Sequence, residues 1–449
     1  MTTARRLDRG IVGTYALGSV GTGGFGVLPG LVLAYYLTDS LAVPALVAAG
    51  VVLIPKLIDV AINPLIGAHS DRLLRRTGSR RAAMLVGAIA LAPLFVLTFC
   101  APVAAWWVSA LWVLVAFSLT AVAYSLFQVP YVALPAELTP DYDERTRLVA
   151  TRIAVLAAAI LLFGAGGPAI RDAVGGARGY LVMAVVAGLV ISAGMVVATI
   201  GTTRRSVVPA GDQPVVEEGA APSFRDAFAA IRTDRRYQVL VAVYVVQALA
   251  SAVMLAGAQY LATYVLGDAS ALQWLFVSLV APALLVMPLW YRFGERRGKL
   301  TGLRLAATLF SLSAVVLVGT VWWNGPWIYA AVCLAGIGYA GMQTFPLAML
   351  PDVLDAYSRR IGRPAAGSLS GLWTAAETVA LAVGPAVFLL VLAATGFVSS
   401  TDGQHAAQPE SALIGISVGF AAIPALLVVG SLILLRRYAE PNPEDPDES

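Results

Sequence analysis

Apolar stretches long enough to cross a bilayer recur along nearly the whole chain. A membrane-spanning helix needs about 20 mostly apolar residues, and stretches of that length alternate with polar segments throughout the sequence. The predicted spans cover residues 11–37, 43–69, 82–101, 106–134, 149–169, 179–201, 237–266, 272–291, 301–323, 326–350, 366–396 and 411–435. The pattern therefore predicts an all-α integral membrane protein with twelve transmembrane helices.

The composition supports this interpretation and excludes others. Of 449 residues, 59% are hydrophobic and 12% are charged, whereas a soluble globular protein carries about 25% charged residues. The mean hydropathy is +0.80. The two cysteines, Cys100 and Cys333, lie inside apolar stretches, so we expect no disulfide framework. With a net charge of only +4, we also expect no nucleic-acid partner.

The basic residues fall on one side of the predicted membrane. That side comprises the N-terminus, the loops from even-numbered to odd-numbered spans, and the C-terminus; it includes five arginines between Arg72 and Arg81. The opposite side holds Arg171 and Arg178. Because Lys and Arg are enriched in cytoplasmic loops, we expect a multi-pass protein of the cell membrane with both termini in the cytoplasm. The apolar stretch after Arg9 is too long for a signal peptide and lacks a small-residue cleavage site, so no cleaved leader is expected.

The two halves of the chain resemble each other. The fourth predicted span carries Tyr124 and Gln128, and the tenth carries Tyr339 and Gln343 at the same spacing, with a proline shortly after each glutamine. Repeated six-helix halves are the plan of major facilitator superfamily transporters. The predicted halves are residues 1–201 and 237–437.

Two polar segments complete the predicted organisation. Residues 202–236 form a cytoplasmic linker between the halves, in which Ser223–Ile231 has the pattern of a short amphipathic helix on the membrane surface. Residues 438–449 form an acidic tail that contains proline and is expected to be disordered.

Three charged residues lie well inside predicted spans: Lys56 and Asp59 in the second, and Glu377 in the eleventh. A charge at the centre of a bilayer costs about 2.5–3.5 kcal/mol on insertion scales, so such residues face a cavity or a partner. Lys56 and Asp59 are three residues apart and share a helix face. They could form a structural ion pair, or Asp59 could bind the coupling cation while Lys56 tunes its affinity.

Polar and aromatic side chains elsewhere in the spans are candidates for substrate binding. Trp373 lies one helical turn before Glu377, so the two form a face on which a ring could stack and a hydroxyl or cation could bind. The alternative is a protonated, purely structural Glu377. Tyr124, Gln128 and Gln343 are further candidates that could instead form helix–helix hydrogen bonds. Arg152 and Gln247 are two more candidates to face a cavity.

Several motifs resemble one branch of the superfamily. Four stretches carry this resemblance: Lys56 to Gly67, then Ser70-Asp71-Arg72, Gly78 and Arg80-Arg81; Tyr15 to Asp39; Gln128 to Thr139, then Asp141-Tyr142 and Arg145; and Met349 to Asp355 with Gly362-Arg363. The spacing between Arg72 and Gly78 is longer than in generic facilitators. The chain is similar in these places to the glycoside–pentoside–hexuronide:cation symporters, the melibiose permease family. The resemblance implies uptake of a small glycoside together with Na+, Li+ or H+.

The resemblance also assigns expected roles in cation coupling. Asp59 matches the first cation-site aspartate of the family, and Lys56 matches a basic position beside it. Asn63 stands where the melibiose permease has a second cation-site aspartate, and Gln128 stands where it has an aspartate that serves both sugar and cation. This site therefore has fewer carboxylates than that of the melibiose permease. We expect it to bind a proton rather than Na+, because Na+ requires several oxygen ligands.

Other positions of the family's sugar site also differ. Thr22 and Gly23 occupy the region of a sugar-binding aspartate, while Glu377 lies beside the position of a lysine in span eleven. Arg152 matches the family's span-five arginine. We therefore expect cation coupling to involve Asp59, Lys56, Asn63 and Glu377.

The loop after the second span carries a predicted gating motif. Asp71 is placed to meet a neighbouring helix N-terminus, while arginines neutralise helix C-termini and anionic lipid. Such contacts would hold one closed state and break in the other. The residues of this motif are Gly67, Asp71, Arg72, Gly78, Arg80 and Arg81.

Together these patterns predict a monomeric secondary transporter that works by alternating access. It imports a small polar solute, a sugar or glycoside, with H+ favoured over Na+, and it uses no cofactor. The alternative is a proton-driven exporter or a carrier of lipids and amphiphiles. An enzyme is disfavoured, since the two histidines, His69 and His405, lack metal-ligand spacing.

Overall fold

The computed structural model describes residues 7–102, 104–139, 141–203, 232–361, 366–401 and 406–438. Within these ranges the chain is helical apart from its connections, and twelve helical segments are long and apolar enough to cross a membrane. The predicted twelve-span, all-α architecture is confirmed. The predicted amphipathic helix at Ser223–Ile231 and residues 439–449 of the tail lie outside the described residues.

Several helices continue beyond the apolar stretches that predicted them. The second span runs over Ala45–Thr77, about two turns past the end expected from hydropathy, and the tenth runs over Trp327–Ile361, about three turns past it. Backbone hydrogen bonding continues the helix into polar sequence outside the bilayer. These extra turns carry the basic residues.

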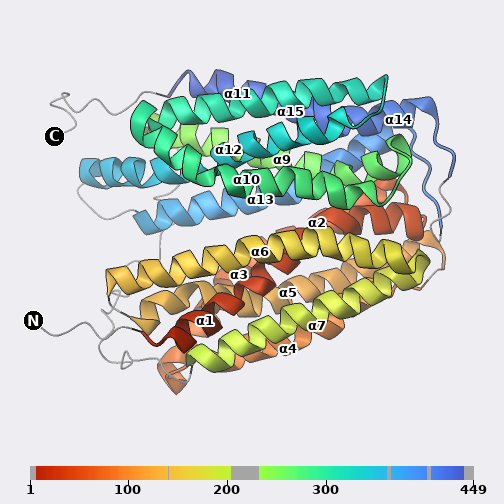
Figure 1. Cartoon of the computed structure of the whole chain (residues 1–449). Helices are drawn as coiled ribbons and strands as arrows, with labels where there is room; N and C mark the ends of the chain where they lie inside the picture. Colours follow the sequence, from red (N-terminus) through yellow and green to blue (C-terminus); the bar gives the residue numbers. More distant parts are fainter. Residues whose placement is uncertain are drawn as a thin grey trace, which may run out of the picture. The chain divides into compact units, whose positions relative to one another are not determined.

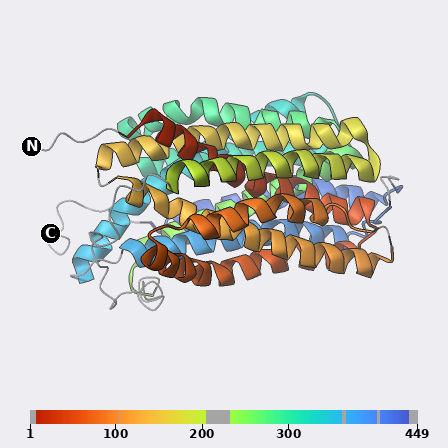
Figure 2. The same ribbon diagram turned by 90° about the horizontal axis from the view of Figure 1, so that it is seen from below.

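Two compact units divide the chain, and each is described by itself. Unit 1 contains the helices up to residue 203 (Figure 1). Its helices are α1 (Arg9–Leu17), α2 (Ser19–Tyr35), α3 (Ala45–Thr77), α4 (Arg81–Thr98), α5 (Trp106–Leu138), α6 (Tyr142–Val174) and α7 (Gly176–Thr203). Helix α2 ends in a wider turn, η1 (Tyr36–Ser40). Helix α4 packs against α5 and α7, α3 packs against α5, and α6 runs beside α7 (Figure 2).

Unit 2 contains the remaining helices. They are α9 (Arg235–Tyr260), η2 (Leu261–Val265), α10 (Ala271–Arg297), α11 (Lys299–Leu317), η3 (Val318–Val321), α12 (Trp327–Ile361), α13 (Ala366–Ala394), α14 (Glu410–Ser417), η4 (Val418–Ala422) and α15 (Ile423–Leu435). Helix α12 packs against α10 and α11, while α9 packs against α13 and α15.

A glycine makes the turn between α3 and α4. Gly78 follows α3 with a positive φ of 70°, and its amide donates a 2.8 Å hydrogen bond to the carbonyl of Leu74. A left-handed residue with such a bond is a common helix ending that favours glycine. Arg75 and Arg76 in the last turn complement the negative end of the helix. The gating motif therefore lies at one sharply turned end of unit 1.

The segment that follows α13 belongs to unit 1, although it lies within the predicted second half, 237–437. Thr401 forms an antiparallel bridge with Leu41. Ser400 donates its amide to the carbonyl of Thr38 at 2.9 Å and accepts the amide of Ala42 at 2.8 Å. These bonds satisfy backbone groups that follow η1, which explains why a segment distant in sequence packs there.

Candidate functional site

Three polar side chains share one face of α3. Asp59 lies one turn after Lys56, and Asn63 lies one turn after Asp59. Asp59 is 8% exposed and accepts a hydrogen bond from the hydroxyl of Ser125 on α5. The Oδ1 atom of Asn63 is buried without a hydrogen-bond partner among the described residues. The structure thus shows a carboxylate, a hydroxyl and an unsatisfied carbonyl oxygen along the α3 face.

Lys56 has aromatic neighbours. Its Nζ lies 5.3 Å from the ring centroid of Phe25 and 6.0 Å from that of Phe117. Such contacts stabilise a cation by about 0.5–2 kcal/mol, with the larger values for desolvated sites. Among the described residues, no ion pair within 4.0 Å joins Lys56 to Asp59. This geometry disfavours the structural ion pair that the sequence left open.

Gln128 and Tyr124 on α5 face α2. The hydroxyl of Thr22 donates a 2.9 Å hydrogen bond to Oε1 of Gln128. One turn earlier, the Tyr124 ring stacks on Phe25 with centroids 4.5 Å apart. Both side chains are half-buried. Phe25 therefore contacts both Tyr124 and Lys56, and it connects the α5 face to the polar face of α3.

Arg152 on α6 lies against a cluster of hydroxyl groups. Its guanidinium carbon is 5.1 Å from the centroid of Tyr131. The Tyr131 hydroxyl donates a 2.7 Å bond to the carbonyl of Tyr15 and lies 3.1 Å from the hydroxyl of Ser19. The Nε atom of Arg152 is buried without a hydrogen-bond partner among the described residues.

Unit 2 contains a second polar cluster, centred on Glu377 of α13. The hydroxyl of Tyr244 on α9 donates a 2.5 Å hydrogen bond to its Oε1 atom. The Tyr244 ring stacks on Trp373, with centroids 4.4 Å apart and an interplanar angle of 20°. The Nε1 atom of Trp373 is buried without an acceptor among the described residues. The predicted pair of indole and carboxylate is therefore present, with Tyr244 contacting both.

The other two candidates of unit 2 have different environments. Gln343 is half-buried and donates to the hydroxyl of Tyr339, one turn earlier on α12, at 3.2 Å. Gln247 is 2% exposed, and its amide donates to Ser431 of α15 at 3.1 Å. The bond to Ser431 matches the helix–helix interpretation better than ligand contact for Gln247.

The residues of the predicted gating motif are arranged around Arg80, which precedes α4 and is 9% exposed. It contacts Asp71 at 2.6 Å and Glu137, near the end of α5, at 2.5 Å. A third bond of 2.8 Å runs to the hydroxyl of Ser70. Arg80 thereby joins the ends of α3, α4 and α5, and Asp71 contacts the residue that precedes α4.

The remaining motif residues have simpler surroundings. Gly67 lies where an added Cβ would make an ordinary 3.7 Å contact with Val129, so the packing there does not require glycine. Arg72 is exposed. Arg81 is half-buried, and its Nε atom has no hydrogen-bond partner among the described residues.

Sequence reasoning missed several residues of these clusters. Ser125 is a small polar residue in an apolar stretch, next to the candidate Tyr124. This position could have identified it as a candidate. Tyr244 lies one turn before the candidate Gln247 on α9. Glu137 lies near the polar end of α5. The sequence shows each of these as a polar residue in or beside a span, but it does not indicate which side chain each one contacts.

Comparison with known proteins identifies the family. A family model described as MFS/sugar transport protein matches residues 14–439. A putative glycoside/cation symporter of Escherichia coli K12 is 25% identical, with 94% of this chain and 90% of the relative covered. A glucuronide carrier protein homolog of the same organism is 24% identical, with 96% and 92% covered. The solved structure of a D-xylose-proton symporter superposes with a TM-score of 0.68 at 13% identity, covering 96% of this chain and 97% of that chain.

The fold, the twelve spans and these relatives define a class of protein, the multi-pass membrane transporter. The chain belongs to the MFS/sugar transport protein family, in its branch of glycoside–pentoside–hexuronide:cation symporters. Members of this family are transporters and not enzymes, and their substrates are small molecules. The family membership that the motif from Lys56 to Arg81 indicates is therefore confirmed.

Proposed function

We propose that the protein is a proton-coupled importer of a small polar solute, a sugar or glycoside, that works by alternating access as a monomer. In this proposal both termini lie in the cytoplasm, on the side that carries most of the basic residues. The names of the full-length relatives support a glycoside or a uronide as the solute class.

The main support for the proposal is the environment of the Asp59 carboxylate. Its carboxylate is buried in a membrane span and accepts a hydrogen bond from Ser125. Among the described residues it has no cation within ion-pair distance. A buried carboxylate of this kind requires a cation or a proton. One carboxylate with a hydroxyl and an amide suits a proton, since a metal cation such as Na+ requires more oxygen ligands.

Each unit by itself contains side chains suited to a sugar. In unit 1, Gln128 and Arg152 provide hydrogen-bonding groups, and Tyr124 adds an aromatic ring with a hydroxyl. In unit 2, Glu377 and Gln343 provide polar groups beside the ring of Trp373. Rings bind apolar sugar faces, while a few placed polar groups fix orientation. Glu377 serves as a second titratable group in this proposal.

The decisive experiment is gradient-driven uptake in proteoliposomes. Purified protein is tested with glycosides and uronides under an inward proton gradient or an inward Na+ gradient. We expect accumulation with the proton gradient and none with Na+ alone. Accumulation of amphiphiles only, or solute efflux only, would replace the proposal with a carrier or exporter on the same fold.

Two variants separate coupling from folding. Asp59→Asn is expected to abolish accumulation but to retain solute exchange at equal concentrations, because exchange needs no net cation movement. Asn63→Asp adds a second carboxylate one turn from Asp59, and we expect it to make transport responsive to Na+. Full accumulation by Asp59→Asn would remove Asp59 from the coupling mechanism.

A further inference from the structure

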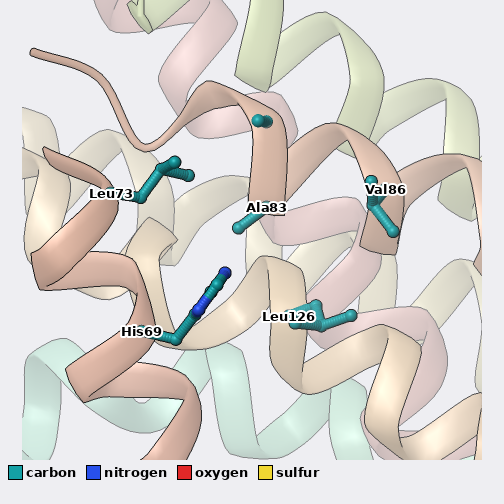
Figure 3. A pocket seen from close by; sticks show the side chains of 6 residues that line it. His69, Leu73, Ala83, Val86 and Leu126 are labelled. Carbon is teal, nitrogen blue, oxygen red and sulfur yellow. The ribbon is translucent and has the colours of Figure 1, made fainter. Parts of the chain in front are cut away.

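A pocket of about 340 Å³ opens on the surface of unit 1 between α3, α4 and α5. Its lining residues are His69, Leu73, Ala82, Ala83, Val86 and Leu126. The ring of His69 points into the space between Leu73, Ala83 and Leu126 (Figure 3). His69 is exposed, and Val86 is 59% exposed, so the pocket is open to the surroundings of the unit. Its lining is apolar except for one imidazole.

The pocket has positive charges on one border. Arg72 and Arg76 follow His69 by three and seven residues on α3, and thus lie on the same helix face. Both are exposed, and within the described chain neither takes part in an ion pair within 4.0 Å. The nearby Asp71 is bound by Arg80. In the part of the chain that the structure describes, the charge on this face is therefore positive and no carboxylate pairs with either arginine.

Arg72 and Arg76 lie nearer the polar end of α3 than His69 does. Helix α3 ends at Thr77, so His69 lies about 12 Å from that end at 1.5 Å per residue. Val86 lies about 8 Å inside the start of α4 at Arg81. Arg76 lies about 2 Å from the same end of α3 and Arg72 about 8 Å from it, so both arginines lie between His69 and the polar end of the helix. This order matches a phospholipid, whose phosphate lies above its acyl chains.

We propose that this pocket binds an anionic phospholipid of the membrane. One acyl chain packs against Leu73, Val86 and Leu126 beside the ring of His69, and the phosphate lies near Arg72 and Arg76. Basic pockets between transmembrane helices are known as sites for anionic head groups. The inference does not depend on which solute or cation the protein carries.

Native mass spectrometry of the purified full chain tests the proposal, with phosphatidylglycerol and phosphatidylcholine as the added lipids. We expect preferential retention of phosphatidylglycerol. The double variant Arg72→Gln/Arg76→Gln should weaken its apparent binding about thirtyfold, if each arginine contributes the roughly 1 kcal/mol typical near a charged surface. Ala82→Trp should displace the lipid by filling the pocket.

Matched variants control for both changes. Arg75→Gln removes an exposed arginine that lies farther from His69 around α3 than Arg72 and Arg76 do. Leu189→Trp adds bulk to an exposed position of α7. Both should retain phosphatidylglycerol. If Ala82→Trp lowers the yield of folded protein, Val86→Trp fills the same pocket from an exposed position. Equal binding of the two lipids, or retention of phosphatidylglycerol in the folded pocket-filling and arginine variants, would overturn the proposal.

Discussion

The hydroxyl of Tyr244 on α9 donates a 2.5 Å hydrogen bond to Oε1 of Glu377 on α13. The same tyrosine ring stacks on Trp373. A hydrogen bond to a charged group contributes about 1.5–3 kcal/mol, more than a neutral one. The orientation of the Glu377 carboxylate is therefore determined by a residue on another helix, and so is the stacking of Trp373.

Glu377→Gln is expected to weaken solute binding and to flatten its pH dependence. The amide keeps the shape and can accept from Tyr244, but it cannot bind or release a proton. We expect the KM for uptake to rise about tenfold, which corresponds to about 1.4 kcal/mol, and to vary less with pH than in the unaltered protein. Uptake kinetics measured over a pH series provide the test.

Thr378→Val is the matched control for Glu377→Gln. Thr378 is also half-buried, but its hydroxyl donates to the carbonyl of Thr374 in the same helix at 2.8 Å. The control should leave the pH profile unchanged. An unaltered KM and pH profile for Glu377→Gln would make this glutamate a structural residue.

Ser125→Ala is expected to alter cation coupling through Asp59. The Ser125 hydroxyl donates to the buried carboxylate, and its loss leaves that oxygen without this donor. We expect about a tenfold change in the apparent proton affinity of transport, at the lower end of the range for a bond to a charged group. The measurement is the proton concentration that gives half-maximal uptake.

A second serine of α5 serves as the control. The hydroxyl of Ser118 donates to the carbonyl of Leu114 in its own helix at 2.6 Å and contacts no carboxylate. Ser118→Ala should leave the proton dependence unchanged. Equal effects of the two substitutions would show that Ser125 acts through helix packing and not through Asp59.

Hydropathy was sufficient to predict the spans, because apolar length is set by the thickness of the bilayer. Helical spacing also predicted that Lys56, Asp59 and Asn63 share a face. Helical spacing could not predict which residues of neighbouring helices these side chains contact. Ser125 lies 66 residues from Asp59, and Tyr244 lies 133 residues from Glu377. Periodicity determines which way a side chain points, whereas packing of whole helices determines what it meets.

The same reasoning explains two further differences from the sequence prediction. Hydropathy ended the second span near residue 69, but α3 continues to Thr77 because polar residues outside the bilayer also form helix. The segment around Ser400 contains no apolar periodicity, and its packing on unit 1 rests on backbone hydrogen bonds. Backbone hydrogen bonds of this kind do not require a particular side-chain pattern, so the sequence does not predict them.

Arg80→Leu is expected to destabilise the protein through Glu137. Both side chains are buried, and removing one partner leaves an uncompensated charge, which typically costs about 3–5 kcal/mol. The double variant Arg80→Leu/Glu137→Leu should recover much of that loss. Thermal unfolding in detergent measures both. If the double variant is no more stable than Arg80→Leu, the contact of Arg80 with Glu137 does not explain the effect, and the contact with Asp71 becomes the more important one.

Gly336→Ala is expected to destabilise unit 2, whereas Gly371→Ala should be neutral or slightly stabilising. A Cβ at Gly336 on α12 would collide with the backbone of Leu279 on α10, which cannot move without separating the two helices. Overpacking of this kind costs about 1–3 kcal/mol. At Gly371 on α13 no atom lies within 4 Å of the added Cβ, and alanine favours a helix over glycine by up to about 1 kcal/mol. Thermal unfolding in detergent should therefore show a lower Tm for the first variant only. Equal Tm values would mean that α10 and α12 are not in the close contact on which the helix packing of unit 2 depends.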